Sequence, residues 1–222
     1  MKETSKSTRQ FCLFGGASGL LGVILIVTSF TINAGPPPGA TYEQMKQFAI
    51  LNQHSILWGA WLQAVGPVFI VLFAFSLVYI AGYTGRLAGW MTFFGATILM
   101  TVSLLEITFY ISTLFKDPPL NGLFVMNLIS AVQHLYFIIA APALFIPLGI
   151  ILIRSGVLPR IFGWFAIGLG LLFFTLGMTT MLILVIPPQI TFFGILQGFW
   201  WLSASLAFLI IAGKAGSPQV QS

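Results

Sequence analysis

The sequence is short of charged residues. Only 6% of its 222 residues are Asp, Glu, Lys or Arg, and only four of these are acidic. A soluble domain carries roughly 25% charged residues, because its surface faces water. This chain instead has 58% hydrophobic residues, with 22 Phe and 6 Trp. The composition therefore argues against a soluble globular domain. It predicts a membrane protein, which has the lipid bilayer as its surroundings and its partner.

Cysteine is almost absent too, since Cys12 is the only one. A single cysteine permits no internal disulfide and no cysteine-based metal cluster. The HExxH zinc motif, the Walker motif and a dinucleotide-binding glycine motif after a strand are also missing. The net charge of +5 comes from scattered basic residues rather than from a long Lys/Arg run. We therefore expect no metal, no cofactor and no nucleic-acid partner.

Long apolar runs dominate what is present. A helix that crosses a bilayer needs about 20 mostly apolar residues, and six segments qualify. They fall at about 11–33, 56–82, 88–114, 123–153, 161–186 and 192–213. The sequence thus predicts an all-α fold, a polytopic bundle of six transmembrane helices that forms one integral membrane domain over residues 1–222.

The first apolar segment follows a short basic stretch at the N-terminus, and a signal peptide has the same pattern. Its apolar run is long, and Ile32 is a poor residue two positions before a cleavage site at Ala34. We therefore expect an uncleaved helix. Its glycines suit close packing against a neighbouring helix; they are Gly15, Gly16, Gly19 and Gly22.

Basic residues are distributed unequally between the two ends of the predicted bundle. Cytoplasmic loops carry an excess of Lys and Arg, so their distribution sets the orientation. With the N-terminus inside, the inner end holds Lys2, Lys6, Arg9, Arg86, Arg154, Arg160 and Lys214. The outer end holds only Lys46 and Lys116. This bias predicts an inner or plasma membrane protein with both termini in the cytoplasm.

The one long loop joins the first two spans on the predicted outer side. Thr41 and Gln44 are spaced as a capping box, which predicts a helix that begins near Tyr42. Apolar residues then recur on one face of it, namely Tyr42, Met45, Phe48 and Ala49. We expect a short amphipathic helix at the outer surface, either separate from the second span or continuous with it. It serves either in binding or only as a lid or connector.

Two turns at the inner end read alike. Arg86 and Trp90 bound the sequence RLAGW at the start of span 3, and Arg160 and Trp164 bound RIFGW at the start of span 5. The Arg side chain lies among the lipid headgroups, the Trp side chain anchors the helix at the membrane–water interface, and Gly lets the start of the helix pack closely on its neighbour. The hairpins of spans 2–3 and 4–5 are either parallel repeats or turns that converged on the same residues.

The second turn also resembles a known family. Residues 155–170, SGVLPRIFGWFAIGLG, have a small residue and Gly, then Leu-Pro-Arg, two residues, and Gly-Trp. These positions are Ser155, Gly156, Leu158, Pro159, Arg160, Gly163 and Trp164. The pattern resembles the turn of a broad group of uncharacterised bacterial six-span inner-membrane proteins, classified as a domain of unknown function. The resemblance implies the six-span architecture and carries no active-site residues.

Glu106 stands inside an apolar run of span 3, where an ionised carboxylate is costly. Ser103, Tyr110 and Thr113 are spaced from it by three and four residues. Residues at these spacings share one face of a helix. Glu106 is therefore predicted to belong to a polar stripe that faces the interior of the bundle.

Other spans carry polar residues at similar depth, counted at about 1.5 Å of helix per residue. Span 4 has a second stripe formed by Asn127, Ser130 and His134, with Gln133 beside it but facing elsewhere. Gln63 lies on span 2 and Gln197 on span 6. These residues predict a polar pocket between spans 2, 3, 4 and 6 that opens outward.

Glu106 and His134 would offset each other's burial cost if they met. Such a pair is able to exchange a proton near neutral pH. The alternative is a protonated Glu106 that only fastens two helices through a neighbouring polar residue. His54 is predicted at the outer interface of span 2, so haem ligation by His54 and His134 is disfavoured by their different depths.

Three functions fit these features. The first is a binding or transport protein for a small solute, linked to protons, which uses the outward pocket. The second is a membrane enzyme that acts on a lipid or isoprenoid, with Glu106 or His134 as general acid or base. The third is an accessory structural subunit that packs in a homo-oligomer or against a membrane partner. The sequence leans away from an enzyme, because no second acid or metal site supports one.

Pro67, Pro142 and Pro147 fall inside spans 2 and 4. Proline removes one backbone donor from a helix and kinks it. These prolines are either part of the pocket or simply tolerated, because membrane helices often accept proline.

Overall fold

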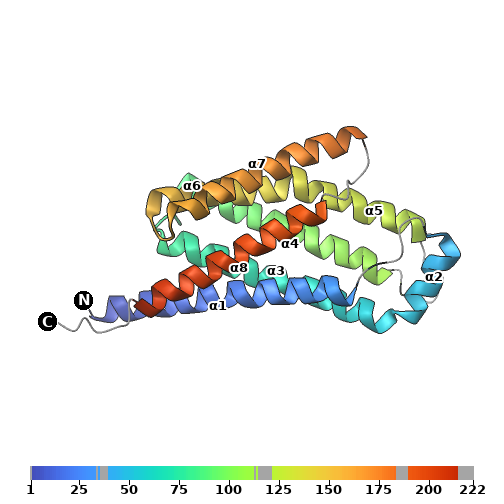
Figure 1. Ribbon diagram of the computed structural model, residues 1–222, viewed down its shortest axis with the longest axis horizontal. Coiled ribbons are helices and arrows are strands. Elements are labelled where there is room, and N and C mark those ends of the chain that lie inside the picture. Colours follow the sequence, from blue (N-terminus) through green and yellow to red (C-terminus); the bar gives the residue numbers. More distant parts are fainter. Residues whose placement is uncertain are drawn as a thin grey trace.

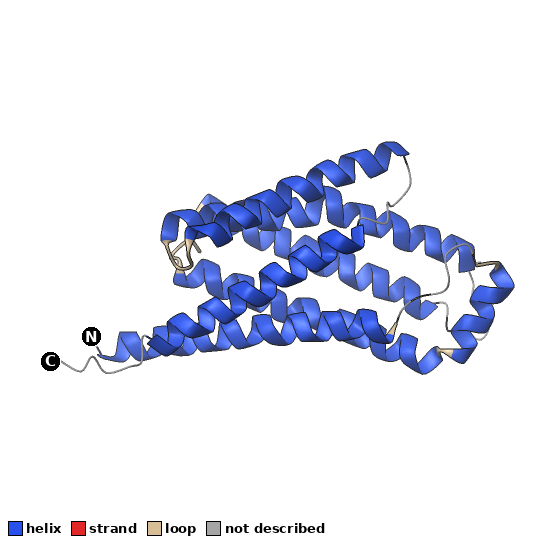
Figure 2. Cartoon of the chain, viewed as in Figure 1, coloured by secondary structure: helices blue, strands red, loops and turns tan. Residues whose placement is uncertain are grey.

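The computed structural model describes residues 2–33, 35, 40–112, 114, 122–183 and 190–214. Figure 2 shows that the described part of the chain consists of helices joined by loops and turns. In chain order they are α1 (Lys2–Ile32), α2 (Tyr42–Leu51), α3 (Gln53–Ile80), α4 (Leu87–Ser112), α5 (Gly122–Leu135), the π-helical segment η1 (Tyr136–Ala140), α6 (Ala141–Ser155), α7 (Arg160–Ile183) and α8 (Ile190–Lys214).

In the part of the chain that the structure describes, six stretches of helix are long and apolar enough to cross a membrane. They are Thr8–Ile32, Gln53–Ile80, Leu87–Ser112, Phe124–Ser155, Arg160–Thr180 and Phe192–Gly213. The fourth of these runs from α5 through η1 into α6. The predicted all-α bundle with six candidate spans is therefore confirmed, and each span begins within a few residues of its predicted start.

The spans lie side by side in one bundle with two different ends (Figure 1). At one end, here called the turn end, residues 81–86 join α3 to α4 and residues 156–159 join α6 to α7. The start of α1 and the end of α8 lie at this end too. Across the opposite end, here called the α2 end, lies α2. Which side of the membrane each end faces stays a prediction.

The predicted helix after span 1 is present as α2. The Thr41 side chain accepts from the backbone N–H of Gln44, and the Gln44 side chain accepts from the backbone N–H of Thr41 at 2.8 Å. Asn52 separates α2 from α3, so the two helices are not continuous. The capping box predicted from the sequence is therefore confirmed.

The glycines of α1 pack closely, as predicted. A Cβ atom on Gly19 would overlap Ser205 of α8 and Phe73 of α3, and one on Gly22 would overlap Ile70 of α3. A Cβ atom on Gly15 or Gly16 would also overlap side chains of the neighbouring helices. Because these positions have no side chain, α1 lies in contact with both α3 and α8.

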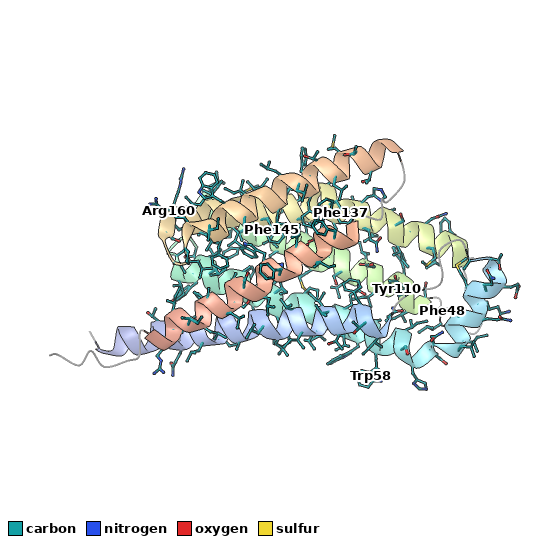
Figure 3. All side chains as sticks on the ribbon, in the orientation of Figure 1. Phe48, Trp58, Tyr110, Phe137, Phe145 and Arg160 are labelled. Atoms are coloured by element: carbon teal, nitrogen blue, oxygen red, sulfur yellow. The ribbon has the colours of Figure 1, made fainter. Side chains whose placement is uncertain are left out.

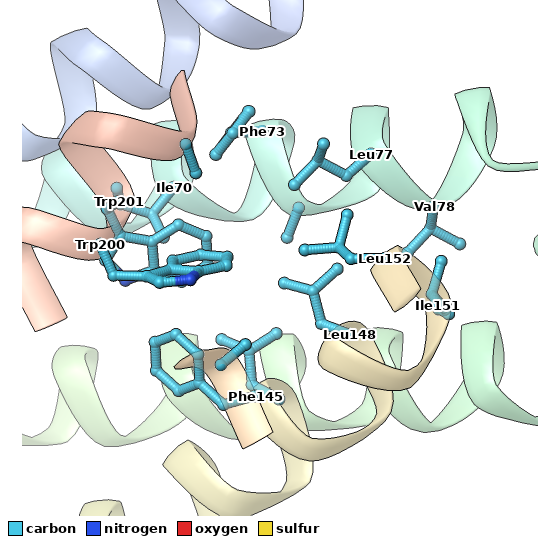
Figure 4. Packing of buried hydrophobic residues seen from close by; sticks show 14 of the residues in the cluster. Ile70, Phe73, Leu77, Val78, Phe145, Leu148, Ile151, Leu152, Trp200 and Trp201 are labelled. Atoms are coloured by element: carbon cyan, nitrogen blue, oxygen red, sulfur yellow. The ribbon is translucent and has the colours of Figure 1, made fainter. Parts of the chain in front are cut away.

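The apolar core lies between α3, α6 and α8, toward the turn end (Figure 4). Phe73 of α3 and Phe145 of α6 are completely buried, and both rings contact Trp201 of α8. The indole Nε1 of the neighbouring Trp200 donates a hydrogen bond of 2.9 Å to the backbone oxygen of Phe162. This bond ties α8 to the start of α7.

The two similar turns share more than their Arg and Trp residues. Gly82 has a φ of 70° and Gly156 a φ of 69°. Each stands four residues before the arginine, Arg86 or Arg160. Only glycine adopts this left-handed conformation without steric cost. The shared glycine favours the repeat interpretation of the two hairpins, which stays a prediction.

The six tryptophans fall into two groups. Trp200 and Trp201 are buried in the core, whereas the other four have more than half of their surface exposed. Two of the exposed residues, Trp58 and Trp61, lie in the first turns of α3 near the α2 end. Trp90 and Trp164 lie in the first turns of α4 and α7 at the turn end. Exposed tryptophans near both ends are typical of the two interfaces of a membrane protein.

Candidate functional site

Pro67 interrupts the hydrogen bonding of α3. A helical N–H at position 67 would bond the carbonyl oxygen four residues earlier, at Gln63, and proline has no N–H. The Ser103 hydroxyl of α4 donates a hydrogen bond of 3.0 Å to this Gln63 oxygen. Both residues are buried. Ser103 therefore replaces the donor that proline removes and joins α3 to α4 at this level.

Glu106 lies one turn along α4 from Ser103 and is partly buried. The Gln133 side chain of α5 donates a hydrogen bond of 2.8 Å to its Oε1 atom. The Gln63 side chain of α3 also lies within hydrogen-bonding reach of the carboxyl group. The carboxyl group thus lies among three helices, with a carboxamide on either neighbouring helix.

Tyr110 completes this group of polar side chains. It lies one turn beyond Glu106 on α4 and interacts electrostatically with the carboxyl group. Figure 3 places Tyr110 toward the α2 end of the bundle. We call Gln63, Ser103, Glu106, Tyr110 and Gln133 the Glu106 cluster. Thr113, the last residue of the predicted stripe, lies outside the described residues.

Of the two alternatives for Glu106, a pair with His134 or a bond to another neighbouring polar residue, the structure has the second. The partner on span 4 is Gln133, which the sequence interpretation turned elsewhere. The Nδ1 atom of His134 lies 2.7 Å from the backbone oxygen of Ser130 on its own helix, and its Nε2 atom has no hydrogen-bond partner among the residues that the structure describes. Polar spacing shows which residues share a face of span 4, but it does not show which face turns toward α4.

The imidazole of His134 has a defined tautomer. A backbone carbonyl only accepts hydrogen bonds, so the contact with the Ser130 oxygen requires the proton on Nδ1. In a neutral imidazole the lone pair is then on Nε2. His134 is only 6% exposed, and this nitrogen is inaccessible to solvent. Buried polar atoms nearly always have a partner, which makes this nitrogen an exception.

Gln197 also lies apart from the Glu106 cluster. The hydroxyl group of Tyr136 in η1 donates a short hydrogen bond to the Gln197 side chain of α8. The helix α8 packs mainly on α1. The predicted pocket between spans 2, 3, 4 and 6 therefore divides into two polar contacts, one around Glu106 on spans 2 to 4 and one joining spans 4 and 6.

The π-helical segment η1 carries Tyr136, which makes the second contact, and ends two residues before Pro142. The N–H group of Ala141 bonds to the oxygen of Tyr136, five residues back, instead of the oxygen four back. Pro142 follows directly and has no N–H. Single π-helical turns inside α-helices are often found at functional sites, and the sequence interpretation did not anticipate this one.

The remaining predicted residues lie outside the Glu106 cluster. Asn127 is exposed on α5, and Ser130 contributes its backbone oxygen to His134. His54 is exposed near the start of α3, where it lines a shallow open groove with Leu57, Trp58 and Trp61. Among the described residues, no three His, Cys, Asp or Glu side chains gather as metal ligands.

Comparison with known proteins finds no match to this chain among family models, curated proteins or solved structures. The resemblance of residues 155–170 to a six-span group therefore rests on that motif and on the six candidate spans. The fold nevertheless defines a class: this is a multi-pass helical membrane protein, embedded in a lipid bilayer.

Proposed function

We propose that this protein binds a proton or a small cationic solute at the Glu106 cluster, and that it uses this binding to transport a small solute. One observation supports the proposal above all. The carboxyl group of Glu106 contacts amide and hydroxyl side chains instead of a basic one. Within the described residues, no Lys, Arg or His side chain pairs with it.

An ionised carboxylate at this position is unfavourable. A charged side chain costs roughly 2.5–3.5 kcal/mol on insertion scales at the centre of a membrane helix, and less toward its ends; Glu106 lies between the two, six residues before Ser112 at the end of its span. The amide of Gln133 offsets part of this cost, but an amide carries no charge. A proton on Glu106 or a bound cation would remove the net charge. The cluster therefore has a physical reason to take up one positive charge.

The side chains of the cluster suit either occupant. A protonated carboxyl group has one O–H donor and one acceptor oxygen. Gln133 already donates to Oε1, and the Gln63 amide beside the carboxyl group carries an oxygen that would accept from the protonated oxygen. For a cation, the same carboxyl and amide oxygens, with the Tyr110 hydroxyl, are the hard ligands that small cations prefer.

The helix α2 supplies a route to the cluster. It has no buried residue, and it packs lightly on α3 and α5, which carry Gln63 and Gln133. Elements with few buried contacts open at low free-energy cost. Movement of α2 would bring water to the cluster without disturbing the apolar core, which lies toward the turn end.

Infrared spectroscopy of the purified protein in lipid tests this proposal. The chain has four acidic residues, and the other three, Glu3, Glu43 and Asp117, lie outside the candidate spans. At neutral pH we expect a carbonyl stretching band from protonated Glu106, which disappears in Glu106→Gln and persists in the control Glu43→Gln. Raising the pH, or adding Na⁺ at constant pH, should remove the band from the wild-type protein.

Transport is tested in proteoliposomes that contain a pH-sensitive dye. A pH gradient should drive proton entry in the wild-type protein, and Glu106→Gln should reduce the rate at least tenfold. Wild-type rates in Glu106→Gln would contradict transport. A carboxyl band that responds to neither pH nor Na⁺ would contradict binding, and Glu106 would then serve only to fasten helices.

A further inference from the structure

The Nε2 atom of His134 is a second polar centre that the Glu106 cluster does not use. It is a buried acceptor to which no described residue donates, on an imidazole whose other nitrogen is held by the backbone oxygen of Ser130. We propose that this nitrogen binds the hydroxyl headgroup of an amphiphilic alcohol, a molecule with an apolar tail that enters from the bilayer between α5 and α7.

The position of α7 supports the site. A Cβ atom on Gly177 of α7 would come within 2.8 Å of the backbone nitrogen of Ile138, so the two helices touch at this pair. His134 lies four residues before Ile138, and Thr180 lies three residues after Gly177 on the antiparallel helix. At about 1.5 Å of rise per residue, His134 and Thr180 are at nearly the same level.

Thr180 does not satisfy His134. Its hydroxyl group donates a hydrogen bond of 3.0 Å to the oxygen of Gly177 on its own helix. It therefore has no proton left for the Nε2 atom of His134. A donor for this nitrogen has to come from outside the described residues, and a hydroxyl group is the neutral donor that best suits an apolar region.

The surroundings favour a molecule with an apolar tail. Phe137, one turn from His134, is buried and stacks on Phe173 of α7 with ring centroids 5.9 Å apart. Leu135 and Ile139, and Met178 on α7, are more than 40% exposed on the outside of the bundle. Exposed apolar side chains of a transmembrane helix face lipid. A ligand that reaches His134 from the bilayer therefore meets apolar side chains, which an alkyl or isoprenoid tail would contact favourably.

The π-helical turn adds a local reason for binding here. His134 lies two residues before η1, whose widened turn is followed by Pro142. Such a turn departs from regular helical packing, and these departures often accompany ligand sites. The site does not need Glu106, so it is independent of the proposed function.

Nitrogen-15 NMR of labelled histidine tests the site directly. The chain has two histidines, and His54 is exposed, so His54→Gln leaves His134 as the only labelled imidazole. The protein is placed in phosphatidylcholine nanodiscs and titrated with farnesol. The matched control is farnesyl methyl ether, which has the same tail but no O–H donor.

We expect farnesol to shift the Nε2 resonance in a saturable way and the ether to leave it unchanged. Binding of radiolabelled farnesol should weaken by about threefold to tenfold in His134→Phe, as expected for the loss of one buried hydrogen bond, and stay unchanged in Glu43→Gln, whose side chain is exposed on α2. Equal shifts with both compounds, or none with farnesol, would overturn the proposal. So would an Nε2 resonance that is already hydrogen-bonded before farnesol is added and does not change, because a water molecule would then be the partner.

Discussion

Ser103 and Gln63 form a hydrogen bond that compensates for a proline. The Ser103 hydroxyl donates to the Gln63 backbone oxygen at 3.0 Å, and that oxygen lacks its helical donor because position 67 is proline. A proline in span 2 and a polar residue on span 3 are therefore parts of one interaction. It fixes α3 and α4 one helical turn from Glu106.

This relationship predicts that Ser103 and Pro67 are energetically coupled. Ser103→Ala should lower the free energy of unfolding by about 1 kcal/mol, the scale of hydrogen bonds between membrane helices. In a Pro67→Ala background the loss should be less than half as large, because the restored backbone N–H at position 67 would then bond the Gln63 oxygen. Unfolding by SDS in mixed micelles measures the four proteins, and an equal loss in both backgrounds would contradict the coupling.

The packing of α1 predicts a steric effect at Gly19. Gly19→Ala would place a methyl group against Ser205 and Phe73, and such overpacking costs roughly 1–3 kcal/mol. Gly168→Ala on α7 is the matched control, because no atom lies within 4 Å of the Cβ position there. The same unfolding measurement should show a change of at most about 0.5 kcal/mol for this control. Equal effects at both positions would show that α1 does not need this close contact.

The route past α2 predicts that Glu106 is reachable from one side of the membrane. With Cys12→Ser as background, Glu106→Cys should react with a membrane-impermeant thiol reagent added at the α2 end. Leu104→Cys on the same helix is the control, since Leu104 is 49% exposed on the outside of the bundle and would face lipid. If the intact folded Glu106→Cys protein reacts no faster than this control, the cluster has no water-accessible route.

The distribution of basic residues predicts the orientation of the bundle. Lys46 on α2 and Arg86 at the turn end are both exposed. In the cysteine-free background, Lys46→Cys should react with an impermeant reagent on intact cells. Arg86→Cys should react only after the cells are permeabilised. The reverse pattern would place the turn end outside and overturn the predicted orientation.

The spans, the capping box and the packing glycines could be predicted because each depends on neighbours in sequence. An apolar run of sufficient length identifies a span, and Thr41 and Gln44 are three residues apart. Gly19 and Gly22 are small residues at helical spacing in an apolar run. None of these features requires knowledge of which helices meet.

The partner of Glu106 could not be predicted in this way. Gln133 and His134 are adjacent in sequence and have nearly the same depth, so depth does not decide between them. They differ in direction around the helix, which depends on how α5 is rotated against α4 and is not encoded in its polar spacing. The sequence showed only that Gln133 is a long polar side chain at about the depth of Glu106. No local pattern identified η1, since prolines such as Pro142 are common in membrane helices.

The distribution of tryptophans gives the protein built-in optical probes of membrane depth. Trp58 and Trp61 mark one end of the bundle, Trp90 and Trp164 mark the other, and Trp200 and Trp201 are shielded. Lipids brominated along their acyl chains should quench the four exposed indoles and leave emission from the shielded pair. The position of the bilayer along the bundle is therefore readable from the fluorescence of the unlabelled protein.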